Sequence, residues 1–177
     1  MKQQRFGIAP MRALFASFAV IVAVLLASCG GGGGIPYTGV TIRPLPADFT
    51  SRKAVAYSPY RTSASEADLA SEVVPKANIK QDLDLLLAAG FRAIRLFDSS
   101  DKVAKQTLEV IRDNNLNIKV QLGAFVLGSS VAESQAEIAR CVALANAFPD
   151  IVLAVSVGNE TMVSWAFNRI EPSVMAG

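Results

Sequence analysis

Apolar residues follow two alternating patterns from about residue 53 to the end of the chain. Short runs of β-branched and aliphatic residues, typical of strands buried on both faces, occupy residues 53–57, 91–97, 117–122 and 151–157. Segments with apolar residues at helical spacing lie between them, at about 75–89, 101–112 and 131–148. Strand followed by helix, repeated in this order, predicts parallel strands joined by right-handed crossovers.

The predicted helices have recognisable ends. Gly90 stands where a helix commonly adopts a left-handed C-terminal conformation, and Ser130 with Glu133 three residues later forms a capping box. The third helix is expected to bury one stripe, formed by Ile138, Cys141, Val142 and Ala145. Cys141 is therefore interpreted as a small core residue and not as a nucleophile.

Polar and aromatic side chains follow all four predicted strands: Tyr57, Tyr60, Arg61, Asp98, Phe125, Asn159 and Glu160. The carboxyl ends of parallel strands meet at one rim, and (β/α)₈ barrel enzymes place their chemistry there. We therefore predict an α/β fold of the TIM-barrel type, with about the first four βα units, or half a barrel. The alternative is an open doubly wound sheet, but no Gly-x-Gly-x-x-Gly motif follows the first strand.

Composition narrows the chemistry. The 177 residues include no histidine, which excludes Ser-His-Asp and Cys-His catalysis and leaves carboxylates, lysines, tyrosines and two cysteines. No cluster of side chains with metal-ligand spacing occurs, so we expect no metal and no cofactor. Basic and acidic residues nearly balance after residue 28, which argues against a nucleic-acid partner.

The first 29 residues have the features of a targeting signal. A basic start, an apolar run over residues 13–27 and then Ser28-Cys29 have the layout of a secretory signal. Leu-Ala-Ser-Cys at 26–29 resembles a bacterial lipobox, which predicts lipidation of Cys29 and membrane anchoring outside the cytoplasm, at the outer membrane in a Gram-negative host. An uncleaved anchor helix is the alternative. The predicted organisation is a signal peptide at 1–28, a glycine-rich tether and extended lead-in at 29–52, and one domain at 53–177.

Three segments together resemble glycoside hydrolase family 17, the β-1,3-glucanases and related transglycosylases. They are Ala-Val-Ser-Val-Gly-Asn-Glu at 154–160, Val-Ala-Tyr-Ser-Pro-Tyr at 55–60 and Ala-Ile-Arg-Leu-Phe-Asp at 93–98. The resemblance implies hydrolysis or transglycosylation of β-1,3-glucan, with Glu160 as general acid/base and Asn159 bound to a sugar 2-hydroxyl. A retaining glycosidase uses two carboxyl groups, one as acid/base and one as nucleophile.

Three further residues are candidates for substrate binding. Asp98 could orient a sugar hydroxyl or cap the helix that follows it. Tyr57 could line the cleft or pack in the core, and Trp165 could stack on a sugar ring or pack behind the site.

The family's nucleophile is a second glutamate at the end of strand seven, whereas the predicted domain reaches only strand four. A full barrel takes about 250 residues. We therefore expect this chain to supply the acid/base half of the site and to be inactive alone, with open sheet edges available for self-association. A lipid-anchored glucan-binding or structural remnant without catalysis is the alternative function, and a doubly wound binding protein outside the cytoplasm is a third.

Overall fold

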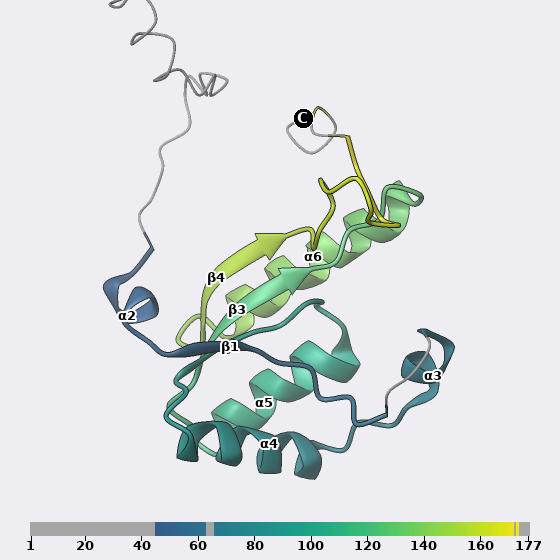
Figure 1. Cartoon of the computed structure of the whole chain (residues 1–177). Helices are drawn as coiled ribbons and strands as arrows, with labels where there is room; N and C mark the ends of the chain where they lie inside the picture. The colour runs from purple at the N-terminus through teal and green to yellow at the C-terminus, as the bar shows by residue number, and fades with distance from the viewer. Residues whose placement is uncertain (1–44, 63–65, 172, 174–177) are drawn as a thin grey trace, which may run out of the picture. The chain divides into compact units, whose positions relative to one another are not determined.

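The computed structural model describes residues 45–62, 66–171 and 173 (Figure 1). They form an α/β unit around one parallel sheet with strands β1 (Ala54–Ala56), β2 (Ala93–Arg95), β3 (Lys119–Ala124) and β4 (Val152–Val157). The helices are α2 (Ala47–Thr50), α3 (Glu66–Ser71), α4 (Lys76–Ala88), the π-helical turn η1 (Asp101–Lys105), α5 (Gln106–Asp113) and α6 (Val131–Ala147).

The strands lie in the order β1-β2-β3-β4, the order of the sequence. An open doubly wound sheet binds ligands where its strand order reverses. Among the described strands no such reversal occurs, so the doubly wound alternative finds no support here. The sheet is consistent with part of a barrel, in which successive strands are neighbours.

Most of the predictions for the N-terminal region concern residues that the structure does not describe. The signal peptide at 1–28, Cys29 and the tether up to residue 44 lie outside the described residues. The prediction of an extended lead-in is wrong near residue 52, its C-terminal end, because Ala47–Thr50 form the short helix α2. No helix in the part of the chain that the structure describes is long and apolar enough to cross a membrane.

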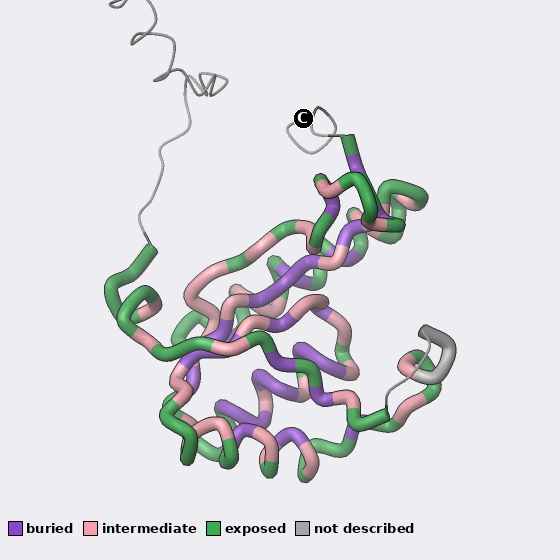
Figure 2. Tube along the Cα trace, in the orientation of Figure 1, coloured by how far each residue is buried: buried purple, intermediate pink, exposed green. Residues whose placement is uncertain are grey.

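One face of the sheet carries the core. Ile94 of β2, Leu96 just after it, and Val120 and Leu122 of β3 are almost fully buried and belong to one core cluster. Figure 2 colours much of the chain at these central strands as buried. Ile79 and Leu83 of α4 and Leu108 and Ile111 of α5 meet them in the same cluster. The predicted helical stripes of these two segments are thereby confirmed.

The buried face of α6 differs from the prediction. Cys141 is buried as expected, but Ile138 and Val142 are 37% and 51% exposed. The buried positions are Glu137 and Cys141, with Leu144 partly buried against the core. The face is rotated because a carboxylate takes the place that an apolar side chain was expected to fill.

The start of α6 provides a test of the local structure. Ser130 is the N-cap, and its hydroxyl accepts a hydrogen bond from the Glu133 backbone N–H at 3.3 Å. Ser130→Ala should lower the free energy of unfolding by about 1 kcal/mol, because this N–H loses its partner. Urea denaturation measures the effect, with Ser129→Ala as the control at the preceding position. Equal losses in the two variants would show that the cap contributes nothing.

Candidate active site

The chain after β4 has an unusual backbone at the proposed catalytic residue. Gly158 and Glu160 both have positive φ, of 82° and 56°. A non-glycine residue in the left-handed region is uncommon, and such backbone strain concentrates at functional sites. Glu160 is exposed, and within the described residues its carboxylate forms no hydrogen bond or ion pair. The carboxylate is therefore open to solvent.

Asn159 is held by a side chain from the end of β2, which lies two strands away from β4 in the sheet. Its side-chain oxygen accepts a hydrogen bond from Arg95 Nη2 at 2.8 Å, and its backbone carbonyl accepts one from the buried Asn168 side chain at 3.0 Å. The Arg95 guanidinium also lies over the Phe97 ring, 5.0 Å from its centroid. The ends of β2 and β4 are thus joined through one arginine, which the sequence reasoning did not single out.

A cavity of about 530 Å³ opens beside the ends of β2 and β3. Its lining combines aromatic rings with charged side chains: Tyr60, Leu69, Ala70, Phe97, Asp98, Phe125, Leu127, Glu133, Glu137 and Arg140. Aromatic faces and carboxylates are the groups that bind sugar rings and their hydroxyls. Phe97 lines this cavity and contacts Arg95, so the cavity and the Asn159 region belong to one rim.

Asp98 lies in this cavity and has a local partner. Its Oδ1 accepts a hydrogen bond from the Ser100 backbone N–H at 2.8 Å, while Ser100 itself is the helix N-cap. The capping role considered for Asp98 is therefore taken by Ser100. Partial burial raises the pKa of the neighbouring Tyr60, and the charge of Asp98 adds to this rise.

A glycine permits the close approach that carries Asp98 to the rim. A Cβ at Gly123 of β3 would lie 2.4 Å from the Leu96 carbonyl oxygen and 2.6 Å from that of Phe97. Heavy atoms do not approach so closely, so only glycine lets the chain after β2 cross here.

The Tyr57 side chain is bound to helix α4. It is buried, and its hydroxyl donates to Asp82 Oδ2 of α4 at 3.1 Å. Burial raises the pKa of Tyr57 well above its usual value, and Asp82 reinforces this. Arg61 also binds Asp82, at 2.7 Å. Both residues therefore fasten the end of β1 to α4, and the structure does not gather them with Asn159.

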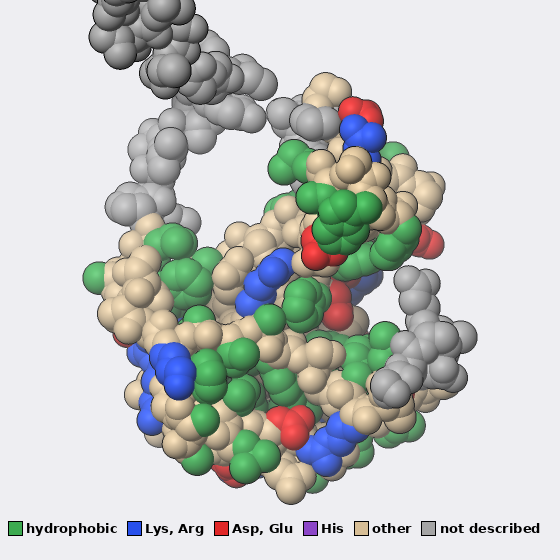
Figure 3. Space-filling view, viewed as in Figure 1, with side chains coloured by type: hydrophobic (Ala, Val, Ile, Leu, Met, Phe, Trp, Pro, Cys, Tyr) green, Lys and Arg blue, Asp and Glu red, His purple; other side chains and the backbone are tan. Residues whose placement is uncertain are grey.

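Trp165 lies on the surface of the segment after β4. It is 72% exposed, and Met162 and Phe167 near it in sequence are 61% and 78% exposed. Figure 3 shows hydrophobic side chains on the surface of the segment after β4. The Phe167 ring lies 6.5 Å from that of Phe125, which links this segment to the cavity lining. The packing alternative considered for Trp165 does not hold, because a core residue would be buried. A role in substrate stacking stays a prediction.

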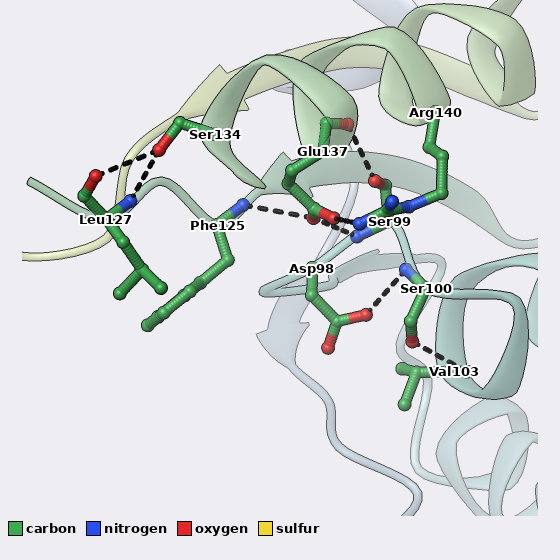
Figure 4. Close-up of polar contacts among 9 residues, drawn as sticks. All are labelled: Asp98, Ser99, Ser100, Val103, Phe125, Leu127, Ser134, Glu137 and Arg140. Carbon is green, nitrogen blue, oxygen red and sulfur yellow. Dashed lines mark hydrogen bonds and ion pairs between the residues drawn. The ribbon is translucent and has the colours of Figure 1, made fainter. Parts of the chain in front are cut away.

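Sequence reasoning missed Glu137, which is only 5% exposed. Its carboxylate accepts hydrogen bonds from the backbone N–H groups of Ser99 and Phe125 and pairs with Arg140 (Figure 4). One signal was available, since Glu137 precedes Cys141 by four residues and shares its helical face. Burial raises the pKa of the Cys141 thiol to about 11, with the Glu137 charge contributing. Among the described residues no group of three or more potential metal ligands occurs.

Comparison with known proteins gives one informative likeness. No protein-family model matches the chain, and no curated protein is significantly similar to it. An endo-laminarinase from Formosa Hel1_33_131 has a similar solved structure, with a TM-score of 0.60 and 28% sequence identity. The likeness covers 71% of this chain and 35% of the laminarinase, so the chain spans about a third of that protein's length.

Proposed function

We propose that this chain belongs to a glycoside hydrolase that acts on β-1,3-glucan-type polysaccharide. The observation that carries the proposal is the structural likeness to an endo-laminarinase, which includes 28% identity in sequence. Membership of glycoside hydrolase family 17 and completion of the sheet to a (β/α)₈ barrel are parts of the same proposal. They rest on the three sequence segments and on the sequential parallel sheet.

Within this proposal Glu160 is the general acid/base. It would protonate the leaving sugar oxygen and later deprotonate the attacking water, in a retaining mechanism with a second carboxylate as nucleophile. Its exposure and left-handed backbone at the end of β4 support a functional role. Asn159 would hydrogen-bond a sugar hydroxyl while Arg95 fixes its orientation.

A second function is favoured by the aromatic cavity. The cavity contains Asp98, Tyr60, Phe97 and Phe125, but Glu160 is not among its lining residues. Glucan binding without catalysis would need only such a surface. Lipid anchoring through Cys29 outside the cytoplasm is also proposed, from the sequence of the first 29 residues.

The test of the proposed function is binding of a laminarin-type oligosaccharide, measured by isothermal titration calorimetry. We expect the protein to prefer the β-1,3-linked oligosaccharide to a β-1,4-linked one of equal length. Asn159→Ala should weaken binding about tenfold, because one hydrogen bond to the sugar is lost.

Asn117→Ala is the matched control for that variant. Asn117 also accepts a hydrogen bond from an arginine, Arg52, at 2.9 Å, but it precedes β3, whereas Asn159 follows β4. Its replacement should leave binding unchanged. Absence of β-1,3-glucan binding in the wild-type protein would refute the proposed function.

A further inference from the structure

We propose that Glu137 is a positioning residue, which fixes Asp98 and Phe125 at the cavity by binding the backbone N–H of Phe125 and that of Ser99, the residue after Asp98. The inference rests on the proposed function for its ligand, a β-1,3-linked glucan. It rests on the contacts of one buried carboxylate for its mechanism. Glu137 belongs to α6, whereas the two residues that it positions follow β2 and β3.

The carboxylate reaches two strand ends with one oxygen. Glu137 Oε1 accepts from the Ser99 N–H at 2.6 Å and from the Phe125 N–H at 3.1 Å. The Ser99 hydroxyl donates to the Glu137 backbone carbonyl at 2.9 Å, so this residue is held twice. Hydrogen bonds to an ionised acceptor are stronger than neutral ones, which makes this an effective clamp.

Its second oxygen is occupied as well. Glu137 Oε2 pairs with Arg140 Nη2 one turn later on α6. A buried charge is costly unless it is paired and hydrogen-bonded, and here both oxygens have partners. Both oxygens of the Glu137 carboxylate thus bind protein groups, unlike those of Glu160. This favours an effect on the ligand through the residues that Glu137 positions.

The residues next to the clamp face the ligand cavity. Asp98 directly precedes Ser99, and its side chain is further set by the Ser100 N–H. Phe125 is the first residue after β3. Figure 4 shows the side chains of Asp98 and Phe125 extending to the same side, away from Glu137. A shift of the clamp would therefore move an aromatic ring and a carboxylate of the lining together.

The adjacent turn of α6 holds the same loop. Ser134 Oγ both accepts from the Leu127 N–H and donates to the Leu127 carbonyl, each at 2.9 Å. Ser134 and Glu137 are three residues apart and lie on one helical face. This face thus binds residues 125 and 127 of the loop after β3, and Glu137 alone also reaches the loop after β2.

The test uses Glu137→Ala and Glu137→Gln in the full chain. Amide hydrogen exchange by NMR should show Ser99 and Phe125 exchanging at least about tenfold faster in Glu137→Ala, relative to the Val120 amide. Val120 donates to the Ile151 carbonyl at 2.8 Å in the core and serves as internal reference. Affinity for a laminarin-type oligosaccharide should fall about tenfold, a difference of 1.4 kcal/mol. Glu137→Gln should restore part of the amide protection and part of the affinity, because its amide oxygen can accept hydrogen bonds from the same two N–H groups.

A destabilised control separates positioning from loss of stability. Leu83→Ala removes a fully buried side chain of α4 that is not among the cavity-lining residues. It should lower the unfolding temperature while retaining affinity. Equal loss of affinity in Leu83→Ala and Glu137→Ala, or unchanged exchange at Ser99 and Phe125, would overturn the proposal. If the wild-type protein binds no β-1,3-glucan, the proposed function fails, and the exchange rates alone decide whether Glu137 holds the two loops.

Discussion

Glu160→Gln is expected to abolish the glucan hydrolysis that this chain shows with formate as an external nucleophile, while leaving glucan binding within about threefold of the wild type. A glutamine has the shape of the acid but no proton to give to the leaving oxygen, and general acid–base catalysis contributes on the order of a thousandfold. Binding survives because the carboxylate has no partner within the described residues whose loss would alter the site. The loss should therefore lie in kcat and not in KM.

A retaining mechanism needs a carboxylate nucleophile in addition to the acid/base, so the assay includes one. We expect the chain alone to be slow on β-1,3-glucan. Added sodium formate should attack the anomeric carbon while Glu160 protonates the leaving oxygen, and water then hydrolyses the glycosyl formate to a new reducing end and formate. That formate-dependent rate should disappear in Glu160→Gln. Glu171→Gln is the control, because Glu171 is exposed and paired with Arg169 at 3.1 Å. Equal rates in the wild type and Glu160→Gln would contradict the catalytic role, and binding without any hydrolysis would favour the non-catalytic alternative.

Gly123→Ala is expected to destabilise the protein by about 3 kcal/mol or more, since a core that is already close-packed cannot accept the added atom. The new Cβ would lie 2.4 Å and 2.6 Å from two carbonyl oxygens of the chain after β2. Both obstacles are backbone atoms, so no side-chain rotation relieves the overlap. Urea denaturation of the purified variant gives the free energy of unfolding.

A second glycine serves as the control for Gly123. Gly90 has a φ of 83°, and a Cβ built there meets nothing within 4 Å. Gly90→Ala should cost only about 1 kcal/mol, the strain of a left-handed alanine. If both substitutions cost the same, crowding by the two carbonyl oxygens would not explain the glycine in β3.

The elements that the sequence predicted well are those with a clear apolar period. The segments predicted as helices at 75–89 and 101–112 bury Ile79 and Leu83 of α4 and Leu108 and Ile111 of α5, and all four strands overlap the apolar runs that predicted them. Ser130 caps α6 as expected. These features follow from local interactions, which the order of residues specifies directly.

The buried acid and the two short helices were not predictable in this way. Glu137 is buried because backbone N–H groups from distant loops meet it, and those loops are 38 and 12 residues away in sequence. A hydrophobic pattern treats such a residue as solvent-exposed, so the expected face of α6 was displaced. The helices α2 and α3 are short and have no apolar period of their own; α2 lies in the segment interpreted as an extended lead-in, and α3 lies where no element was predicted.

The sequence predicted several residues of the candidate site but not the contacts between their side chains. The rule that parallel strands end at one rim placed Asp98, Phe125 and Asn159 together in outline. It could not show that Tyr57 binds Asp82, or that Arg95 joins Asn159 to the end of β2. Those arrangements depend on side-chain directions that only the packed structure fixes.

The sequential strand order also bears on how the protein is made. Because β1 pairs with β2, β2 with β3 and β3 with β4, each new strand adds to the outer side of its predecessor. Among the four strands that the structure describes, none has to be inserted between two that are already paired. A nascent chain can therefore extend this sheet as it leaves the ribosome, one strand and its covering helix at a time.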